Sequence, residues 1–242
     1  MRNFSHKNVI AIKRESTWKG TSNCRTCGMR DMGLFADLND DDFDTIHALV
    51  DDMKFAQGST LFQEGGAAQG LFTLRSGMIK LVRTTAGGSQ RIVRVLRPGD
   101  VAGLEALAHA HYDSDAVALT EVSVCRIPLA VIHTLQARSP RMNQKLMEKW
   151  SCALKEADDW LVDMNFGSAR SRVSNFVLKM NGVMEAQTVT LFAREDMGTM
   201  MDLEMETVSR QINALVREGA LESLDNRGRF YRILNRQQLQ PS

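Results

Sequence analysis

Two cysteines near the N-terminus are the residues whose type and spacing most directly suggest chemistry. Cys24 and Cys27 stand three apart in the stretch NCRTCGMRDMG, residues 23–33. The chain has four cysteines in 242 residues and no sign of a secretory leader. Paired thiols in a reducing compartment are more often metal ligands or redox groups than structural disulfides. The spacing therefore predicts a metal or cluster site or a thiol switch, and the rest of the chain must decide between them.

A second group with chemical potential lies near the C-terminus, in METVSRQINALVREGAL (205–221). Glu206, Ser209 and Arg210 stand at i, i+3 and i+4, so in a helix they project from one face. Arginine forks onto guanine, glutamate accepts a hydrogen bond from cytosine, and serine serves either base. An exposed Glu–Arg ion pair would have the same spacing. The flanking elements decide for base reading, and the opposite face is apolar through Val208, Ile212, Leu215 and Val216.

The elements around this group have the order of a helix-turn-helix domain. Residues 194–203 predict a first helix, Leu203-Glu204 a tight break, and 205–221 the second helix. Upstream, 168–183 predicts an amphipathic helix with basic residues at its start. Downstream, 221–234 predicts a hairpin that turns at Asp225-Asn226-Arg227-Gly228. Such a hairpin would form a wing beside the second helix.

The middle of the chain has a different texture. Between residues 55 and 127, glycines separate short alternating stretches rich in Val, Ile, Leu and Thr, which predicts an antiparallel β barrel or sandwich. Before these strands, Asn39 is a good N-cap for a short helix, whose apolar face would run from Phe43 to Met53. Residues 1–34 show no period and are expected to form an irregular arm.

A long helix is predicted from Ser139, a cap, and Pro140, at the first helical position. One apolar stripe has the 4-3 spacing of a coiled-coil seam, and we expect it to join two copies of the chain. A second stripe, Met147, Leu154 and Leu161, would pack on the chain's own β unit. The alternative is a buried helix in a monomer. The predicted seam consists of Leu146, Trp150, Ala153, Ala157, Trp160 and Met164.

Composition excludes some classes of protein. The chain is 43% hydrophobic and 24% charged with a net charge of +1, so two globular domains are expected and no bulk positive field marks a nucleic-acid binder. A small basic face is sufficient for DNA binding. Apolar runs are too short for a signal peptide or a membrane span, and we expect a cytoplasmic protein without a membrane. No base and pocket of an enzyme are evident, so we expect no catalysis.

The whole arrangement resembles the Crp/Fnr family of bacterial transcription regulators. The resemblance runs from about Cys24 to Ile233 and rests on GSTLFQEGG, GLFTLRSGMIKL, RPGDVAG, SVCRIP, the segment 194–221 and the closing hairpin. It implies an α+β chain: an arm (1–34), a β-roll sensor (35–137), a dimerisation helix (138–166) and a winged helix-turn-helix (167–242). It also implies a homodimer on a palindromic DNA operator, with RNA polymerase as a further partner. The competing class is a β-roll module that regulates a protein partner.

The resemblance also implies roles for single residues. The E-x-x-S-R pattern of the Fnr-type reading head is met by Glu206, Ser209 and Arg210. Thr207 stands where the family contacts a phosphate. Arg194 and Ser168 are further candidates for contacts to the DNA backbone. Phosphate contacts would set affinity and register, whereas the reading head would set sequence.

The Fnr branch holds a [4Fe–4S] cluster with three cysteines of the arm and one at the end of the β-roll. Cys24, Cys27 and Cys125 match three of these positions, and the fourth falls at Gly33. Several interpretations stay open: a cluster with Asp31 as an oxygen ligand, or a labile three-cysteine cluster. The alternatives are a redox dithiol, a zinc site, or no metal, with control by another small molecule or by abundance.

Cyclic-nucleotide members of the family bind phosphate with an Arg-Ser/Thr-Ala stretch, which here reads Ser114-Asp115-Ala116. No Lys or Arg occurs between Pro98 and Cys125. A buried phosphate without a cation would be an uncompensated charge, and aspartates at 113 and 115 would add repulsion. We therefore do not expect cyclic AMP or cyclic GMP as the ligand.

Overall fold

The computed structural model describes residues 33–39, 42, 50–181 and 187–240. The described residues form two compact units, one within 33–89 and 93–154 and the other within 90–92 and 155–240. Each unit is described by itself below. No described helix is long and apolar enough to cross a membrane.

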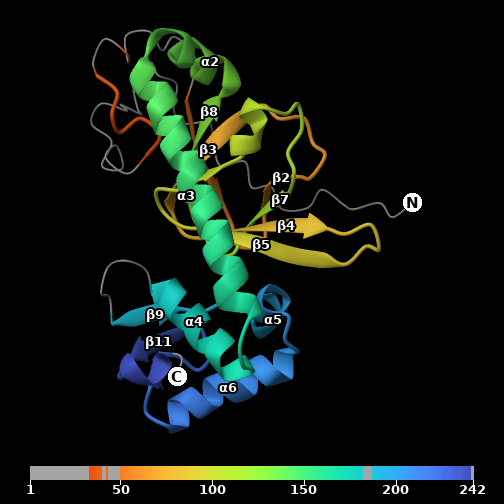
Figure 1. The fold of residues 1–242 in the computed structure, drawn as a ribbon, viewed down its shortest axis with the longest axis vertical. Helices are drawn as coiled ribbons and strands as arrows, with labels where there is room; N and C mark the ends of the chain where they lie inside the picture. Colours follow the sequence, from red (N-terminus) through yellow and green to blue (C-terminus); the bar gives the residue numbers. More distant parts are fainter. Residues whose placement is uncertain (1–32, 40–41, 43–49, 182–186, 241–242) are drawn as a thin grey trace. The chain divides into compact units, whose positions relative to one another are not determined.

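The first unit is an antiparallel β-roll (Figure 1) built from two four-stranded sheets, with strand orders β1-β8-β3-β6 and β2-β7-β4-β5. This confirms the predicted antiparallel β unit. A 3-10 turn, Leu104–Leu107, follows β6. The strands are β1 (Asp51–Phe55), β2 (Thr60–Phe62), β3 (Gly70–Ser76), β4 (Ile79–Thr84), β5 (Gln90–Leu96), β6 (Val101–Ala102), β7 (Asp115–Ala118) and β8 (Val122–Pro128).

The glycine-separated stretches fold this way because alternate side chains enter one core. Leu74, Ile79 and Val124 are fully buried there, and burial of each such side chain contributes about 1.5–3 kcal/mol. The turn at Gly77 admits no other residue, because its φ is +83° and a Cβ would lie 2.2 Å from the Glu121 carbonyl oxygen. The alternation thus sets the sheets and glycine sets the corners.

The predicted helix after Asn39 is partly outside the described residues. Asn39 and Asp42 exchange reciprocal side-chain to backbone hydrogen bonds of 2.9 and 3.1 Å, which is the geometry of a helix start. Met53 was assigned to this helix wrongly, since it lies in β1 and pairs with Val124 of β8. Pairing with a distant strand overrides the local helical spacing at this end.

Two helices follow β8. The first, α2 (Leu129–Arg138), was not predicted, and it buries Val131, Ile132 and Leu135. The second, α3 (Pro140–Asn165), begins at the predicted proline. The Ser139 hydroxyl does not cap it, because this buried oxygen has no hydrogen-bond partner among the described residues. The start of α3 is therefore set by Pro140 and not by a serine cap.

The two apolar stripes of α3 have the reverse of the predicted exposure: the stripe expected at a dimer contact is largely buried, and the stripe expected in the core is exposed. Leu146, Trp160 and Met164 are only 1–5% exposed and pack within their own chain, so they cannot supply a surface to a second copy. Ala153 and Ala157 are half-buried, whereas Trp150 is 40% exposed. The stripe assigned to the chain's own core is the open one, with Met147, Leu154 and Leu161 at 61–69% exposure. The spacing showed two stripes but held no information on which faces inward.

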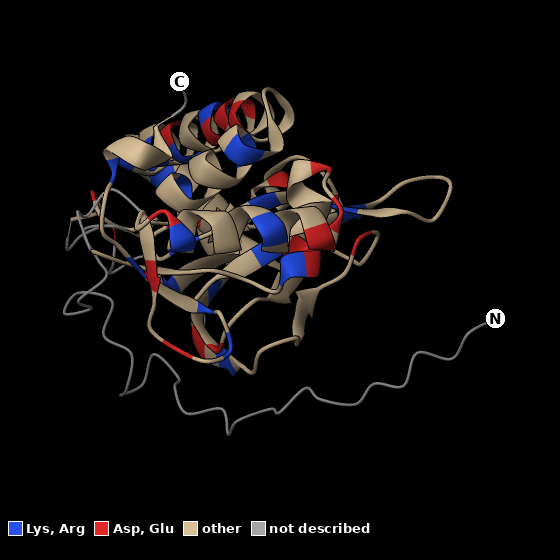
Figure 2. Cartoon of the chain, turned by 90° about the horizontal axis from the view of Figure 1, so that it is seen from below, with Lys and Arg blue, Asp and Glu red and all other residues tan. Residues whose placement is uncertain are grey.

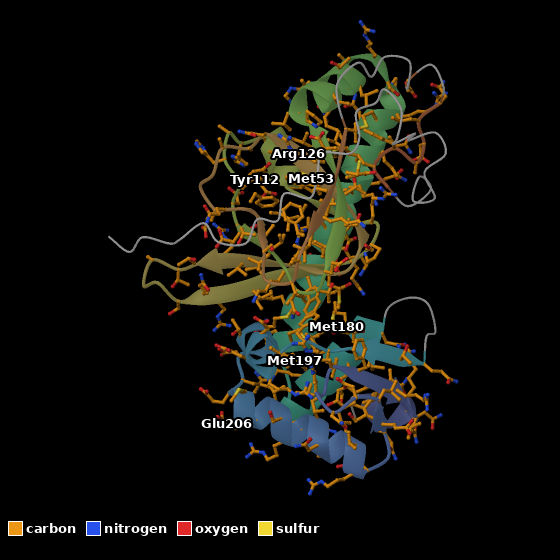
Figure 3. The ribbon with its side chains drawn as sticks, turned by 180° about the vertical axis from the view of Figure 1, so that it is seen from behind. Met53, Tyr112, Arg126, Met180, Met197 and Glu206 are labelled. Atoms are coloured by element: carbon orange, nitrogen blue, oxygen red, sulfur yellow. The ribbon has the colours of Figure 1, made fainter. Side chains whose placement is uncertain are left out.

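The second unit packs helices on one small sheet of order β10-β11-β9. Phe176 lies at its centre, edge-on to Trp160 at 6.0 Å and to Phe192 at 5.4 Å. Met180 and Met197, both labelled in Figure 3, are also buried in this unit. The elements are α4 (Ala169–Asn181), β9 (Thr188–Thr190), α5 (Arg194–Met201), α6 (Met205–Arg217), β10 (Leu221–Ser223), β11 (Phe230–Ile233) and a 3-10 turn (Gln237–Leu239).

Candidate nucleic-acid interface

A tight turn joins α5 to α6 at the place where the sequence predicts a break. Asp202 takes a left-handed conformation with φ of 54°, and the Leu203 amide donates to the Gly198 carbonyl at 3.0 Å. A Cβ on Gly198 would lie 2.4 Å from the Leu203 carbonyl oxygen. Only glycine permits this close approach, so Gly198 fixes the angle at which α6 leaves α5.

The apolar face of α6 docks on the domain and leaves the opposite face in solvent. Val208, Ile212 and Leu215 are fully buried, while Glu206 and Arg210 are exposed and Ser209 is half-buried. Glu206 lies on the free side of α6 in Figure 3. The three predicted reading residues therefore share one accessible face. That face is a shallow groove lined by Met205, Glu206, Ser209, Arg210, Asn213 and Arg217.

Three of these groove residues were missed by the sequence interpretation. Asn213 and Arg217 stand seven and eleven residues after Glu206, so the helical period alone could have placed them on the same face. Met205 occupies the first position of α6 and is 48% exposed. The groove thus offers an acceptor, a hydroxyl, an amide and two guanidinium groups along one helix.

The Arg210 side chain is already oriented by its own helix. Its Nη2 donates to the Thr207 hydroxyl at 3.2 Å. Within the described part of the chain, Arg210 makes no salt bridge with Glu206, so the ion-pair alternative for this spacing is not what the helix forms. Thr207 was predicted as a phosphate contact, and its hydroxyl here accepts the bond from Arg210.

The wing is organised by one carboxylate. Asp225 accepts hydrogen bonds from the backbone amides of Phe230 at 3.0 Å, Arg229 at 2.9 Å and Arg227 at 3.2 Å. These bonds favour the charged form of Asp225 and hold its pKa below the ordinary value. The bond from the Phe230 amide has the largest effect. The turn therefore presents Arg227 and Arg229 on a fixed backbone.

Arg194 and Ser168 have structural roles that the sequence did not predict. Arg194 Nη2 donates to the Tyr231 hydroxyl at 2.7 Å, and its guanidinium lies 5.7 Å from the centre of that ring. This contact ties the start of α5 to strand β11 of the wing. The Ser168 hydroxyl accepts from the Ser171 amide at 3.1 Å and so caps α4.

Charge on the chain is mixed, and Figure 2 shows acidic and basic residues interspersed over the helices. Several cations of the second unit are paired, including Arg232 with Glu222 at 2.7 Å and Lys179 with Asp163 at 3.2 Å. In contrast, Arg210 and Arg217 in the groove form no salt bridge with a described residue. Guanidinium groups without a carboxylate partner on one face would be attracted to the phosphates of DNA.

The predicted cysteine site is described in part. Cys24, Cys27 and Asp31 lie outside the described residues, and the part that is described contains no group of three metal-ligating side chains. Cys125 is half-buried on β8, opposite Thr73 of β3 and Asp52 of β1. The Thr73 hydroxyl is buried without a hydrogen-bond partner among the described residues. A buried hydroxyl beside a thiol fits a thiolate or a sulfide, which can accept a hydrogen bond from it.

The family's phosphate-binding stretch carries an acid instead of a base. The Asp115 carboxylate accepts a hydrogen bond from the Glu64 backbone amide at 2.7 Å. Between the β-roll and α3, Lys149 Nζ donates to the Gly99 carbonyl at 2.8 Å and Arg94 Nη1 to the Ala153 carbonyl at 3.4 Å. Burial is the main reason that the pKa of Lys149 lies below its ordinary value. These cations are engaged with carbonyl oxygens of their own chain.

The second unit, with its exposed α6, close α5–α6 turn and β10–β11 wing, defines a winged helix-turn-helix DNA-binding domain. Two family models match the chain: a cyclic nucleotide-binding domain over residues 52–139 and a Crp-like helix-turn-helix domain over residues 171–241. The chain belongs to the Crp/Fnr family of DNA-binding transcription regulators.

Relatives and solved structures agree with this assignment. The fumarate and nitrate reduction regulatory proteins of Escherichia coli and Salmonella typhi are each 26% identical over 217 residues, which is 87% of either chain. The structure of FixK2 from Bradyrhizobium japonicum shares the fold with a TM-score of 0.72 at 23% identity, over 80% of this chain and 98% of that one. TTHB099 of Thermus thermophilus, a CRP-family regulator, has a TM-score of 0.65 at 22% identity, over 77% and 94%.

Proposed function

We propose that the chain is a homodimeric regulator that reads a palindromic operator with α6 and has no catalytic activity. One observation carries the proposal: Glu206, Ser209 and Arg210 share the solvent face of a helix whose opposite face is fully buried. Each α6 would enter a major groove, with half-sites about one helical turn apart. The family resemblance suggests half-sites near TTGAT, and RNA polymerase as the partner of the bound dimer.

The open stripe of α3 supports a dimer. Met147, Leu154 and Leu161 recur every seven residues at 61–69% exposure, and Trp150 lies between the first two. Such a repeat on an isolated surface helix would leave large apolar side chains in water. A symmetric pairing of two α3 helices would bury the same stripe from both copies.

For the signal, the proposal is an iron–sulfur cluster held by Cys24, Cys27 and Cys125, with Asp31 as the candidate fourth ligand. When bound, such a cluster supplies a centre that reacts with oxygen. The chain's own contribution at Cys125 is a half-buried thiol and the Thr73 hydroxyl opposite it. This hydroxyl makes no hydrogen bond within the described part of the chain, so it can donate to sulfur and stabilise the thiolate. The relatives named for fumarate and nitrate reduction support a redox role.

A second candidate is a regulator of the same family without a metal. Gly33 stands where the family has its fourth cysteine, and this favours control by another small molecule or by abundance. Cyclic AMP is not the proposed ligand under either candidate, because the Asp115 carboxylate occupies the phosphate-binding stretch and would repel the phosphate. We expect calorimetry with cyclic AMP to show no saturable heat at physiological concentrations. Micromolar affinity would contradict this expectation.

The experiment that tests the function is fluorescence anisotropy with three DNA duplexes: the full palindrome, one half-site, and a scrambled palindrome of equal length. We expect tight binding to the palindrome, much weaker binding to the half-site, and strongly salt-dependent residual binding to the scrambled duplex. Equal affinity for palindrome and scrambled DNA would show that the binding is not sequence-specific. No binding to any of the three duplexes would instead support a β-roll module that acts on a protein partner.

A further inference from the structure

A pocket of about 480 Å3 opens at one end of the β-roll, between the two sheets of the first unit. Small-molecule sites commonly have volumes of about 300–1,000 Å3. Its walls come from β1, β2, β3 and β8, the segment 63–69, and Tyr112. Figure 3 labels three of its residues, Met53, Tyr112 and Arg126, which lie together in this unit. No residue of the DNA-reading face, the wing or the α3 stripe lines it.

The floor of the pocket is a fixed aromatic platform. Phe62 stacks on Tyr112 with ring centres 3.9 Å apart and planes 18° from parallel, and Phe72 lies 5.6 Å from Phe62. The Tyr112 hydroxyl donates to the Gly70 carbonyl at 2.8 Å and accepts from the Gly70 amide at 3.3 Å. This ring therefore cannot swing away. Phe62, Phe72 and Tyr112 are each only 5–7% exposed, so the platform offers a planar, apolar body a small but rigid area of ring carbon to pack against.

The wall beside this platform is also preformed. The Gly65 amide donates to the Tyr112 carbonyl at 2.8 Å, the Tyr112 amide donates to the Gly66 carbonyl at 3.0 Å, and the Ala68 amide donates to the Ala110 carbonyl at 2.8 Å. The segment 63–69 is thus bonded along its length to the segment that carries Tyr112. Because the site is already ordered, binding of a ligand would cost little conformational entropy, which favours binding of small molecules.

The polar side of the pocket carries one charge. Among the described lining residues, only Arg126 is ionised. Its Nη1 pairs with Asp51 at 3.2 Å, and its Nη2 makes a long bond of 3.4 Å to the Gln69 side-chain oxygen. A carboxylate could replace that long bond with a shorter, charge-assisted one. Because Asp51 already balances part of the charge, a single negative charge suits the site better than a doubly charged phosphate.

We propose that this pocket binds a small aromatic carboxylate. The ring lies against Phe62, Phe72 and Tyr112, and the carboxylate points to Arg126 and to the Gln69 amide. Neither Asp115 nor Cys125 lines the pocket, although Cys125 immediately precedes Arg126 in β8 and Asp115 accepts a hydrogen bond from the amide of Glu64 in the pocket wall. It gives the β-roll a ligand whether or not the chain holds a metal.

The test is calorimetric titration of the full-length chain with benzoate, benzamide, cyclohexanecarboxylate and inorganic phosphate. Benzoate is expected to bind with a Kd of about 1 mM or below, a plausible affinity for a ligand of this size. Benzamide lacks the charge and cyclohexanecarboxylate lacks the flat ring, so each should bind at least about fivefold more weakly than benzoate. Phosphate should give no saturable heat.

Three variants sharpen the test. Arg126→Gln should weaken benzoate binding about tenfold, as expected for loss of one charge-assisted hydrogen bond, and leave benzamide binding unchanged. Asp51→Asn removes the competing carboxylate and should tighten benzoate binding. Arg75→Gln is the matched control, because Arg75 pairs with Asp52 at 2.8 Å, and Asp52 points to the opposite face of β1 from Asp51.

Several results would overturn the proposal: no benzoate binding, equal affinity for benzoate and benzamide, or unchanged benzoate affinity in Arg126→Gln. An equal loss in Arg75→Gln would likewise show that the effect is general and not local. Melting temperatures check that each variant is folded. If Arg126→Gln does not fold, Asp51→Asn decides the matter, since it keeps the guanidinium and predicts a change in the opposite direction.

Discussion

Arg210 is held in place by its own helix before any DNA is bound. The bond from its guanidinium to Thr207 at 3.2 Å spans one helical turn and removes some rotamer freedom that binding would otherwise have to remove. In the proposed function, three residues of the same turn would act together. Glu206 and Arg210 would read bases of opposite donor and acceptor pattern, and Thr207 would orient the longer of the two side chains.

Replacing Arg210 with alanine should separate base reading from general attraction to DNA. We expect Arg210→Ala to cost about 1–3 kcal/mol on the matched operator and to relax selectivity at one G·C pair. Anisotropy with operators changed at single positions measures both effects. Arg232→Ala is the control, because Arg232 is exposed on the wing but paired with Glu222 at 2.7 Å. Equal losses of Arg210→Ala on matched and scrambled DNA would show that Arg210 contacts only the backbone.

Asp225 should make the wing sensitive to acid. The hydrogen bond from the Phe230 amide is the largest cause of its lowered pKa, followed by bonds from the amides of Arg229 and Arg227. A lowered pKa in the folded state means that the stabilisation is present above the ordinary aspartate pKa of about 3.9 and is lost as the pH falls through the folded value.

We therefore expect amide exchange of Arg227, Arg229 and Phe230 to be slow near neutral pH and to accelerate relative to the rest of the domain below about pH 4. Asp225→Ala should show the fast exchange at neutral pH, measured by NMR. Asn226→Ala changes the neighbouring turn residue and should leave the three amides protected. Slow exchange in Asp225→Ala would mean that strand pairing alone holds the turn.

At the level of elements, α3 decides whether two copies associate. Leu154 is 65% exposed at the middle of the open stripe. Leu154→Glu would place a charge in a dry contact twice per symmetric dimer. We expect at least a 100-fold weaker dimer, about 2.7 kcal/mol, together with weak operator binding. Light scattering gives the mass.

Lys155→Glu is the control for this substitution. It places the same carboxylate one residue further along α3, at a side chain that is 75% exposed and points about 100° away from Leu154. It also removes the ion pair of Lys155 with Asp159, and an exposed pair of this kind contributes little to stability. A chain that remains dimeric as Leu154→Glu would rule out this stripe as the interface. Monomers from both variants alike would point to a general effect of charge on α3.

The elements that the sequence predicts well are those whose local pattern and tertiary role agree. The alternating stretches between glycines became strands, and the break at Leu203 became the helix-turn-helix turn because Gly198 permits it. The failures have a common cause. Met53 belongs to β1 because β8 pairs with it, and the stripes of α3 were exchanged because only the packed chain shows which side is covered.

The candidate site likewise has features that the sequence predicts and features that it does not. Glu206, Ser209 and Arg210 could be placed on one face from spacing alone, since a helix repeats every 3.6 residues. The roles of Arg194 and Asp225 could not be predicted. The partner of Arg194 is Tyr231, 37 residues away, and the bonds of Asp225 depend on the turn that it helps to form. Contacts over long sequence separations appear only once the fold is known.

In the whole molecule, the proposed sensing residue and the proposed dimer helix belong to one continuous stretch. Cys125 lies in β8, which leads directly into α2 and then into α3. A change of charge at Cys125 would act on a strand buried between β1 and β3. Such a change of charge affects dimerisation only if its free-energy cost differs between the monomer and the dimer. The cysteine site must therefore be tested by its chemistry and by its effect on association together.

The last prediction concerns Cys24, Cys27 and Cys125. Anaerobically reconstituted protein should contain iron and show the visible absorption of thiolate-bound iron, and it should lose both in air. Cys125→Ser should abolish the absorption, whereas Cys152→Ser, at an exposed cysteine of α3, should leave it unchanged. Thr73→Val, which removes the hydroxyl opposite Cys125, should speed the loss in air.

Gly33→Cys is the variant with the opposite expected sign. It restores a thiol at the position where the family has its fourth ligand, so the absorption should persist longer in air. Light scattering and operator binding, measured with and without the cluster, should change together with the absorption. Colourless, iron-free protein after anaerobic reconstitution would contradict the cluster. If the Cys24→Ser, Cys27→Ser double variant also binds the operator as the original chain does, the metal-free candidate stands, because operator reading by α6 does not depend on these thiols.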